Sequence, residues 1–335
     1  MDSDCYRSLT ETVGLVTRLN RGRIALSGDD RATYLQGLLT NDIVSLQEGH
    51  GCYAVYLTPQ GRIVADAEVF NVGDRLLLDV HGSVKQLLVD RFEELIFTED
   101  VSIEDWTDTW AGYVLAGPKA DSYLAEVLPQ VSDQIGRWPV NVCQQLSVGG
   151  ASLIVSHSDP FGINGFSFWA ERETTEDLRR MLLEAGCSEV DENTADVVRI
   201  EQGRPVFPND LNADVIPLEA GIENRAISFT KGCYVGQEVV VRILHRGHGR
   251  LARKLIGLRM KSLCDQSSGP SVGARLWSGT ETVGKITSVG FSGATGTMIG
   301  LGYVNRKWLE PGTLLHVDAG SERVPAEVTE LPFSD

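Results

Sequence analysis

Cysteine is scarce in this chain, and its six residues are widely spaced. They stand at positions 5, 52, 143, 187, 233 and 264, and none forms a CxxC pair. A zinc finger or a redox dithiol needs close pairs, and a small secreted domain needs a denser disulfide framework. The spacing argues against these three classes and predicts free thiols in a reducing compartment.

Long apolar runs and an excess of positive charge are also missing. No tract approaches the roughly 18 continuous apolar residues that a membrane-spanning helix requires. Thirty Lys and Arg residues oppose 46 Asp and Glu residues, which gives a formal net charge of −16. Such a surplus of negative charge repels phosphate backbones. We therefore expect neither a membrane segment nor broad nucleic-acid binding.

The first residues carry acid where a targeting segment would carry base. Asp2, Asp4 and Glu11 lie in the opening stretch MDSDCYRSLTETVGLV, whereas secretory leaders begin with positive charge and mitochondrial leaders are poor in acid. We therefore expect a cytoplasmic protein. The 42% hydrophobic and 23% charged residues are typical of a globular chain, which we expect to be a monomer.

Hydrophobic periodicity predicts an α+β fold with an internal duplication. Residues 24–27 and the hairpin of CYAVYL and GRIVADAEVF around TPQG have the pattern of strands, and residues 31–39 and 83–96 have that of helices, the second capped by Ser83. A second, looser round follows between GYVLAG and the helix TTEDLRRMLLEAG. Two related units of antiparallel sheets with helices on one face fit this order.

The character of the sequence changes near residue 250. Before it, a predicted helix over 192–203 leads into RPVFPNDLNADVIPLEAG, a loop too long for an ordinary connection and of the kind that often lines sites. After it, short apolar runs separated by glycine predict a small antiparallel β-barrel. We therefore predict an α+β region over 1–250 and a β-barrel over 251–335.

The segment KGCYVGQE offers a candidate reactive thiol. Lys231 places an ammonium two residues from Cys233, and a neighbouring cation favours the thiolate that acts as nucleophile or metal ligand. Gln237 and Glu238 add hydrogen-bonding capacity. The alternative for any single cysteine is a small buried hydrophobe.

A cationic strip over residues 242–254, RILHRGHGRLARK, contrasts with the acidic whole. It suits a small polyanion or an acidic partner, and a solvated basic edge is the alternative. His245 and His248 form an HxxH pair inside it, but no further metal ligand stands nearby. We therefore expect no metal site.

Charged residues also mark the hairpin and the long loop. Asp66 and Glu68 share one face of a predicted strand, where they either form a carboxylate pair for proton transfer or decorate an exposed sheet face. Arg199, Glu201 and Glu219 border the long loop. They either contribute to a site or form salt bridges that pin the loop.

Several stretches match a known family in order and spacing. LSGDDRATYLQGLLTNDIVSLQEG, TPQGRIVADAEVF, the run from RIEQGRP to PLEAGI, and RKLIGL resemble the glycine-cleavage T-protein superfamily over nearly the whole chain. KGCYVGQEVVVR resembles the signature of its YgfZ branch. The resemblance implies a three-lobed ring of two related α+β lobes and a C-terminal β-barrel, with tetrahydrofolate in a central channel.

The resemblance also implies a function. Proteins of the YgfZ branch bind folate and support the maturation or repair of certain iron–sulfur enzymes. We therefore expect a tetrahydrofolate-binding accessory protein with iron–sulfur client proteins, in which Cys233 is the functional thiol and Lys231 assists it. The residues expected at the folate are Asp66, Arg199, Glu201, Glu219, Gln237 and Glu238.

Two departures from the family pattern count against the alternative, a folate-dependent aminomethyltransferase. Ala65 stands where the family's hairpin has the first of two aspartates, the one assigned the catalytic role, and leaves only Asp66. Ile163 replaces a glutamate that anchors the pterin, and an aliphatic side chain cannot make those hydrogen bonds. A third hypothesis is a thiol protein without folate that docks partners through the cationic strip.

Overall fold

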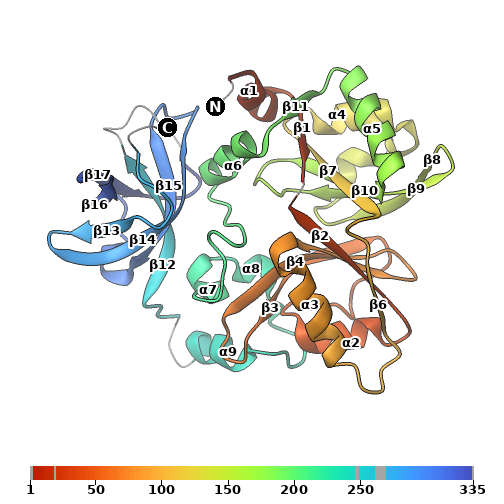
Figure 1. Cartoon of the computed structure of the whole chain (residues 1–335), viewed down its shortest axis with the longest axis horizontal. Helices are drawn as coiled ribbons and strands as arrows, with labels where there is room; N and C mark the ends of the chain where they lie inside the picture. The colour runs from red at the N-terminus through yellow and green to blue at the C-terminus, as the bar shows by residue number, and fades with distance from the viewer. Residues whose placement is uncertain (1–2, 19, 246–248, 261–268, 334–335) are drawn as a thin grey trace.

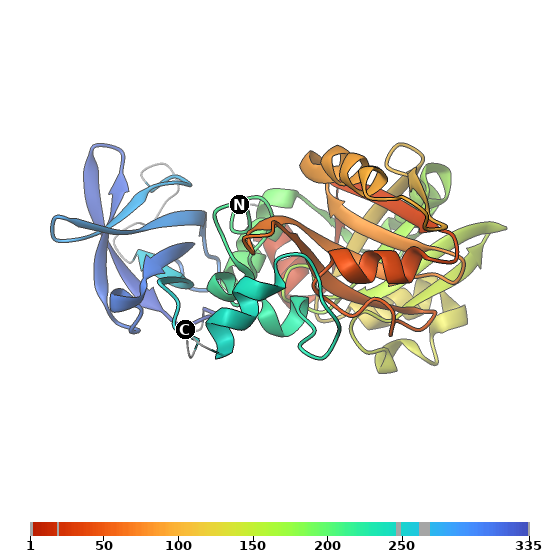
Figure 2. The ribbon, with the colours of Figure 1, turned by 90° about the horizontal axis from the view of Figure 1, so that it is seen from below.

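Three lobes surround a group of central helices (Figure 1). The computed structural model describes residues 3–18, 20–245, 249–260 and 269–333. Seen from below, the barrel stands at one end of the molecule and the two sheet lobes overlap at the other (Figure 2). No helix in these described ranges is long and apolar enough to cross a membrane.

The first lobe is a five-stranded antiparallel sheet covered on one face by helices. Its strands follow the order β3-β4-β5-β2-β6. The elements are β2 (Arg21–Ser27), α2 (Arg31–Leu38), β3 (His50–Leu57), β4 (Ile63–Asn71), β5 (Leu76–His81), α3 (Gly82–Glu94) and β6 (Ser102–Asp105). The predicted hairpin is confirmed. The predicted cap of helix α3 is wrong: His81, not Ser83, is the capping residue, because its side chain accepts from the Ser83 N–H.

The second lobe is a six-stranded sheet in the order β11-β1-β7-β10-β9-β8. Its elements are α1 (Ser3–Glu11), β1 (Gly14–Thr17), β7 (Trp110–Ala116), α4 (Ala120–Val127), η1 (Pro129–Val131), η2 (Ile135–Arg137), β8 (Cys143–Val148), β9 (Ala151–Ser158), β10 (Gly165–Glu171), α5 (Arg172–Glu184) and β11 (Ser188–Val190). All pairs are antiparallel except β1 with β11. The indole N–H of Trp169 on β10 donates to Asp79 on β5 at 2.7 Å, which joins the two lobes.

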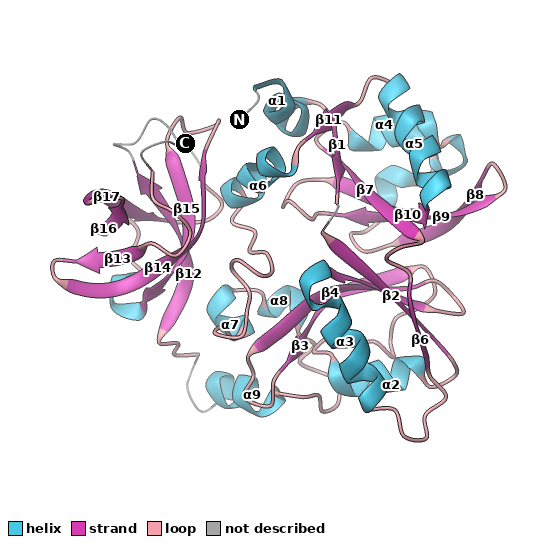
Figure 3. Cartoon of the chain, viewed as in Figure 1, coloured by secondary structure: helices cyan, strands magenta, loops and turns pink. Residues whose placement is uncertain are grey.

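The third lobe is a closed six-stranded barrel in the order β12-β15-β14-β13-β16-β17. Its elements are β12 (Arg253–Met260), β13 (Arg275–Ser278), β14 (Glu281–Phe291), β15 (Met298–Asn305), η3 (Arg306–Trp308), β16 (Leu314–Ala319) and β17 (Glu322–Thr329). Aliphatic side chains such as Leu258, Ile286 and Leu315 fill its interior. Figure 3 shows this lobe as almost entirely strand.

The central helices and the long loop connect the lobes. They are α6 (Glu192–Glu201), α7 (Pro217–Ala220), α8 (Glu223–Ala226) and α9 (Gln237–His245). Arg199 on α6 is 1% exposed, and its guanidinium donates to the carboxylate of Asp210 in the loop at 2.6 Å. Asp210 also accepts from Ser288 of the barrel at 2.8 Å. These bonds fix the loop between α6 and the barrel. The predicted three-lobed α+β fold with a C-terminal barrel is confirmed.

Candidate functional site

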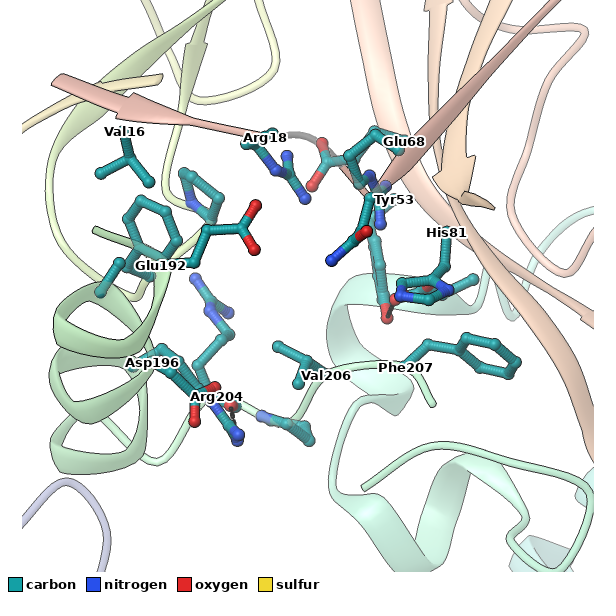
Figure 4. Close-up of a pocket in the computed structure, with 18 of the residues that line it drawn as sticks. Val16, Arg18, Tyr53, Glu68, His81, Glu192, Asp196, Arg204, Val206 and Phe207 are labelled. Carbon is teal, nitrogen blue, oxygen red and sulfur yellow. Dashed lines mark hydrogen bonds and ion pairs between the residues drawn. The ribbon is translucent and has the colours of Figure 1, made fainter. Parts of the chain in front are cut away.

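A cavity of about 210 Å³ lies where the first-lobe sheet, α6 and two loops meet (Figure 4). Nine of its lining residues are Asp, Glu or Arg. The lining residues are Val16, Arg18, Asn20, Arg21, Tyr53, Asp66, Glu68, His81, Pro160, Phe161, Glu192, Ala195, Asp196, Arg199, Arg204, Pro205, Val206, Phe207 and Arg225. Figure 4 shows Tyr53, Glu68 and His81 on one side and Glu192 and Asp196 of α6 on the other.

Asp66 presents an unsatisfied acceptor to this cavity. The residue is 8% exposed, and its Oδ2 accepts from the Tyr53 hydroxyl at 3.0 Å. Its Oδ1 is buried and has no hydrogen-bond partner among the described residues. Buried polar atoms are nearly always hydrogen-bonded, so an oxygen without a partner on a cavity-lining residue is a free acceptor for a donor that enters the cavity. Burial and the adjacent Asp66 carboxylate raise the pKa of Tyr53, which keeps that hydroxyl protonated as a donor.

The Ala65 position does not face the cavity. Successive side chains of a strand point to opposite faces. Ala65 is 1% exposed and packs in the core under α2 and α3, whereas Asp66 and Glu68 point the other way. An acid at position 65 of this chain would therefore lie in the apolar core. The loss inferred from the family pattern at Ala65 removes no carboxylate from the cavity, because Asp66 supplies it.

Glu68 sits beside Asp66 on the same face of β4. Burial raises the pKa of its carboxyl, and the charges of Arg225, Arg18 and Arg21 oppose that rise without cancelling it. Asp66 and Glu68 therefore do not decorate an exposed sheet face, which was one of the two predicted roles, because both line the cavity.

The raised pKa of Glu68 makes a testable statement about stability. A folded-state pKa above the unfolded value means that the contribution of the group is present below the unfolded pKa and is lost as pH rises through the folded pKa. We therefore expect Glu68→Gln to stabilise the protein at pH 7 but not at pH 4. Urea unfolding at both pH values measures this, with the exposed Glu94→Gln as control. An equal difference at both pH values would contradict the assignment.

Arginines hold the charge balance of the cavity. Burial alone would raise the pKa of Asp79, but the charges of Arg21, Arg18 and Arg23 bring it below its usual value. Arg21 donates both to the Asp79 carboxylate and to its backbone carbonyl. Burial and the neighbouring Arg21 lower the pKa of Arg18 to about 10, so Arg18 still carries its charge at neutral pH.

His81 adds a neutral donor to the cavity wall. Its Nδ1 lies 2.8 Å from the Ser83 hydroxyl and accepts from the Ser83 N–H at 3.2 Å. Acceptance at Nδ1 assigns the ring proton to Nε2. Burial, followed by the charge of Arg21, lowers the pKa of His81. The ring stacks obliquely on Phe207 at 5.8 Å, which fixes its orientation.

Three of the charged residues predicted at the site have structural partners. Arg199 lines the cavity, but its guanidinium is engaged by Asp196 at 2.7 Å, by Asp210 and by Ser288. Glu201 accepts from the hydroxyls of Tyr6 and Ser292 and lies outside the cavity lining. It clamps α1 and the barrel to α6.

Glu219 lies outside the cavity lining as well. It accepts from the Ile216 N–H at 3.3 Å at the start of α7, and the Arg253 guanidinium lies 3.2 Å from its carboxylate. The contacts of Arg199 and Glu219 fit the second of the two predicted roles, which is salt bridges that pin the loop.

The KGCYVGQE segment lies apart from the cavity lining. Cys233 is exposed. The Lys231 ammonium donates to the backbone carbonyls of Gln36 and Leu39 at 2.6 Å and of Asn41 at 2.8 Å, so it fastens the segment to the C-terminal end of α2. Burial lowers the pKa of Lys231 to about 8. Its role in this structure is to hold the segment that carries Cys233.

Gln237 and Glu238 begin α9 and line a second, shallow hollow with Pro59 and Val241. The structure therefore brings together Asp66 and Arg199 of the six predicted folate residues, and it places the other four elsewhere. His245 ends α9, and His248 lies outside the described residues. Within the described ranges, no three His, Cys, Asp or Glu side chains gather as metal ligands would.

Sequence reasoning missed several residues of the cavity wall. Tyr53 pairs with Glu68 across β3 and β4, and His81 pairs with Arg21 across β5 and β2. The alternation of the neighbouring strands was the signal that would have placed them on the Asp66 face. Arg225 left no comparable signal, because it lies in the short helix α8 and only the fold of the chain brings it to the cavity.

The whole chain matches known proteins. Residues 4–231 match the GCVT N-terminal domain, and residues 253–335 match the glycine cleavage T-protein C-terminal barrel domain. A chloroplastic protein of Arabidopsis thaliana, provisionally named as a transferase, is 29% identical over 99% of this chain and 74% of its own length. An aminomethyltransferase of Rubrobacter xylanophilus is 29% identical over 98% of this chain and 85% of its own.

The fold has a solved counterpart. The crystal structure of the glycine cleavage system aminomethyltransferase T from Bartonella henselae superimposes with a TM-score of 0.85 at 21% identity, and the match covers 99% of this chain and 89% of that one. An identity this low supports the shared fold alone. Together with the two domain matches, which cover most of the sequence, it leads to one conclusion. This chain belongs to the glycine cleavage T-protein family.

Proposed function

We propose that this protein binds a reduced folate in the central cavity and catalyses folate-dependent transfer of a one-carbon unit. The observation that carries the proposal is the buried Oδ1 of Asp66, a cavity-lining residue, which has no hydrogen-bond partner among the described residues. Relatives named aminomethyltransferase support transfer chemistry. Ala65 does not count against this function, because its side chain lies in the core and not at the cavity.

The cavity wall suits the pterin part of a folate. A reduced pterin offers a row of N–H donors, and Asp66 and Glu68 offer carboxylate acceptors on one wall. Val16, Phe161 and Val206 provide apolar surface on which a ring can pack. Ile163, which stands where the family has a glutamate, packs against apolar neighbours and offers no acceptor to a pterin. Recognition of the pterin N–H groups therefore falls to other acids of this chain.

The chemistry divides between ligand and protein. A bound reduced folate supplies the nitrogen atoms that carry the one-carbon unit. Asp66 Oδ1 holds or accepts a proton at the wall, and the Tyr53 hydroxyl orients the carboxylate through Oδ2. His81 offers its Nε2 proton from the neighbouring strand. The surrounding side chains limit access of water, which strengthens each of these polar contacts.

Direct titration tests the proposal. Tetrahydrofolate added to the purified protein under anaerobic conditions is expected to bind with a micromolar dissociation constant, measured by calorimetry or by quenching of tryptophan fluorescence. Trp169 bonds to Asp79 near the cavity and is a suitable reporter. Failure of both tetrahydrofolate and 5,10-methylenetetrahydrofolate to bind at millimolar concentration would overturn it.

A second candidate function is supported by the position of Cys233. We propose, on the resemblance to the YgfZ signature, that the protein supports iron–sulfur enzymes through this thiol. Cys233 is the exposed cysteine among the five within the described part of the chain, and Lys231 holds its segment through three backbone carbonyls. A thiol that reaches solvent on a fixed segment is accessible to a client protein.

Substitution of Cys233 separates the two functions. Cys233→Ala is expected to abolish rescue of an iron–sulfur enzyme in cells that lack this protein, and to leave tetrahydrofolate affinity unchanged because the thiol is not in the cavity lining. Cys5→Ala is the matched control, since Cys5 is partly exposed but lies on α1. Full rescue by Cys233→Ala would refute the thiol function and leave folate binding untouched.

A further inference from the structure

Two guanidinium groups converge on one carboxylate at the cavity wall. Arg204 donates through Nη2 to the carboxylate of Asp159 and to its backbone carbonyl at 3.2 Å. Arg225 approaches the same carboxylate only to 3.9 Å, beyond hydrogen-bond distance. The Arg204 Nε is buried and has no hydrogen-bond partner among the described residues. Asp159 therefore hydrogen-bonds only one of the two guanidiniums that approach it.

Asp196, an acid on α6 that also lines the cavity, already has a partner other than Arg204 and Arg225. Asp196 is bonded to Arg199 at 2.7 Å. Burial, and next the like charge of Arg225, lower the pKa of Arg204, as expected for two crowded guanidiniums. Arg225 also stacks on the Tyr53 ring at 4.4 Å, which holds its planar group in place.

We propose that Arg204 and Arg225 form a carboxylate-binding subsite, with Asp159 as the internal acid that a ligand carboxylate displaces or joins. The cavity then offers two kinds of group to a ligand. Asp66 and Glu68 can accept from N–H groups, and the two guanidiniums can donate to a carboxylate. Paired guanidiniums suit a planar carboxylate, which can take parallel N–H donors.

Two kinds of ligand can supply the carboxylate that this subsite would bind. It belongs either to the glutamyl tail of the folate or to a small amino acid that carries the one-carbon group on its nitrogen. The first source rests on the proposed function, whereas the second does not require folate. Both predict a ligand with N–H donors at one end and a carboxylate at the other.

Calorimetric titration with three probes tests the subsite. Tetrahydrofolate carries the pterin and the tail, 5,6,7,8-tetrahydropterin lacks any carboxylate, and N-methylglycine is a small amino acid. Arg204→Gln is expected to weaken the carboxylate probe that binds by about tenfold or more, and to leave tetrahydropterin affinity within about twofold. Asp159→Asn is expected to tighten the same probe several-fold, because it frees both guanidiniums.

The opposite signs of these two effects set the subsite apart from a merely structural ion pair. The control Arg180→Gln, at an exposed pair on α5, should change nothing. Equal weakening by both substitutions, or equal weakening of tetrahydropterin, would overturn the subsite. If neither tetrahydrofolate nor tetrahydropterin binds but N-methylglycine binds through Arg204, the proposed function fails and the subsite stands. If no carboxylate probe binds the unsubstituted protein, the subsite is wrong.

Discussion

Asp66→Asn is expected to lower folate-dependent one-carbon transfer by about 10²- to 10⁴-fold, the range for loss of a proton-transferring side chain. The amide keeps the shape of the carboxylate and still accepts the Tyr53 hydroxyl, but it cannot take up a proton at the position of Oδ1. The fold should survive, because the substitution removes a buried charge. Single-turnover transfer and the affinity for tetrahydrofolate are the two measurements, and the rate should fall far more than the affinity.

The matched control for Asp66 is its neighbour Ala65. Ala65→Asp restores the acid that the family pattern has at this position, but it points the charge into the core under α2 and α3. We expect no gain in transfer, and a loss of stability of several kcal/mol unless the new acid stays protonated. A gain in transfer by Ala65→Asp, or an unchanged rate in Asp66→Asn, would show that the cavity face of β4 is not the reactive one.

These two neighbours also show how far the sequence alone leads. Alternation along β4 places Ala65 and Asp66 on opposite faces, and that much was predictable. Which face meets a cavity depends on packing: α2 and α3 cover the Ala65 face, while α6 and the loop after it approach the Asp66 face. Local periodicity carries no information on such contacts between distant segments. An alignment to a family pattern that names one position therefore says little until the face is known.

The cluster of Arg204, Arg225 and Asp159 was hidden for the same reason. Asp159 and Arg204 come from two loops and Arg225 from helix α8, and no spacing relates them. The KGCYVGQE segment is the opposite case. Its sequence is distinctive, but its Lys231 donates to three backbone carbonyls and does not line the cavity. The distinctive KGCYVGQE motif thus lies outside the cavity lining, whereas residues without a recognisable motif form the cavity wall.

The two candidate functions are compatible in one molecule because they use different surfaces. The proposed folate chemistry uses the cavity around Asp66, and the thiol of Cys233 lies outside the lining of that cavity. The relatives named aminomethyltransferase favour the first, whereas the signature around Cys233 favours the second. Substitutions at Asp66 and Cys233 should therefore have separable effects on transfer and on iron–sulfur rescue.

The largest effect on stability is expected from Asp210→Ala. Asp210 is fully buried and accepts from the Arg199 guanidinium at 2.6 Å, from the Val206 N–H at 3.1 Å and from the Ser288 hydroxyl at 2.8 Å. Its removal leaves the buried Arg199 without its main counter-charge. Loss of one partner of a buried ion pair costs about 3–5 kcal/mol, which urea unfolding should detect directly.

The same substitution should also weaken ligand binding, since Asp210 anchors the loop that carries Arg204 and Val206 into the cavity. Asp214→Ala is the matched control in that loop: its side chain is exposed, and the contacts of Asp214 with Arg62 and Arg253 run through its backbone carbonyl. We expect it to change stability by no more than about 0.5 kcal/mol. If Asp210→Ala costs no more than this control, the buried pair does not hold the loop, and the placement of Arg204 at the cavity must depend on its contact with Asp159 instead.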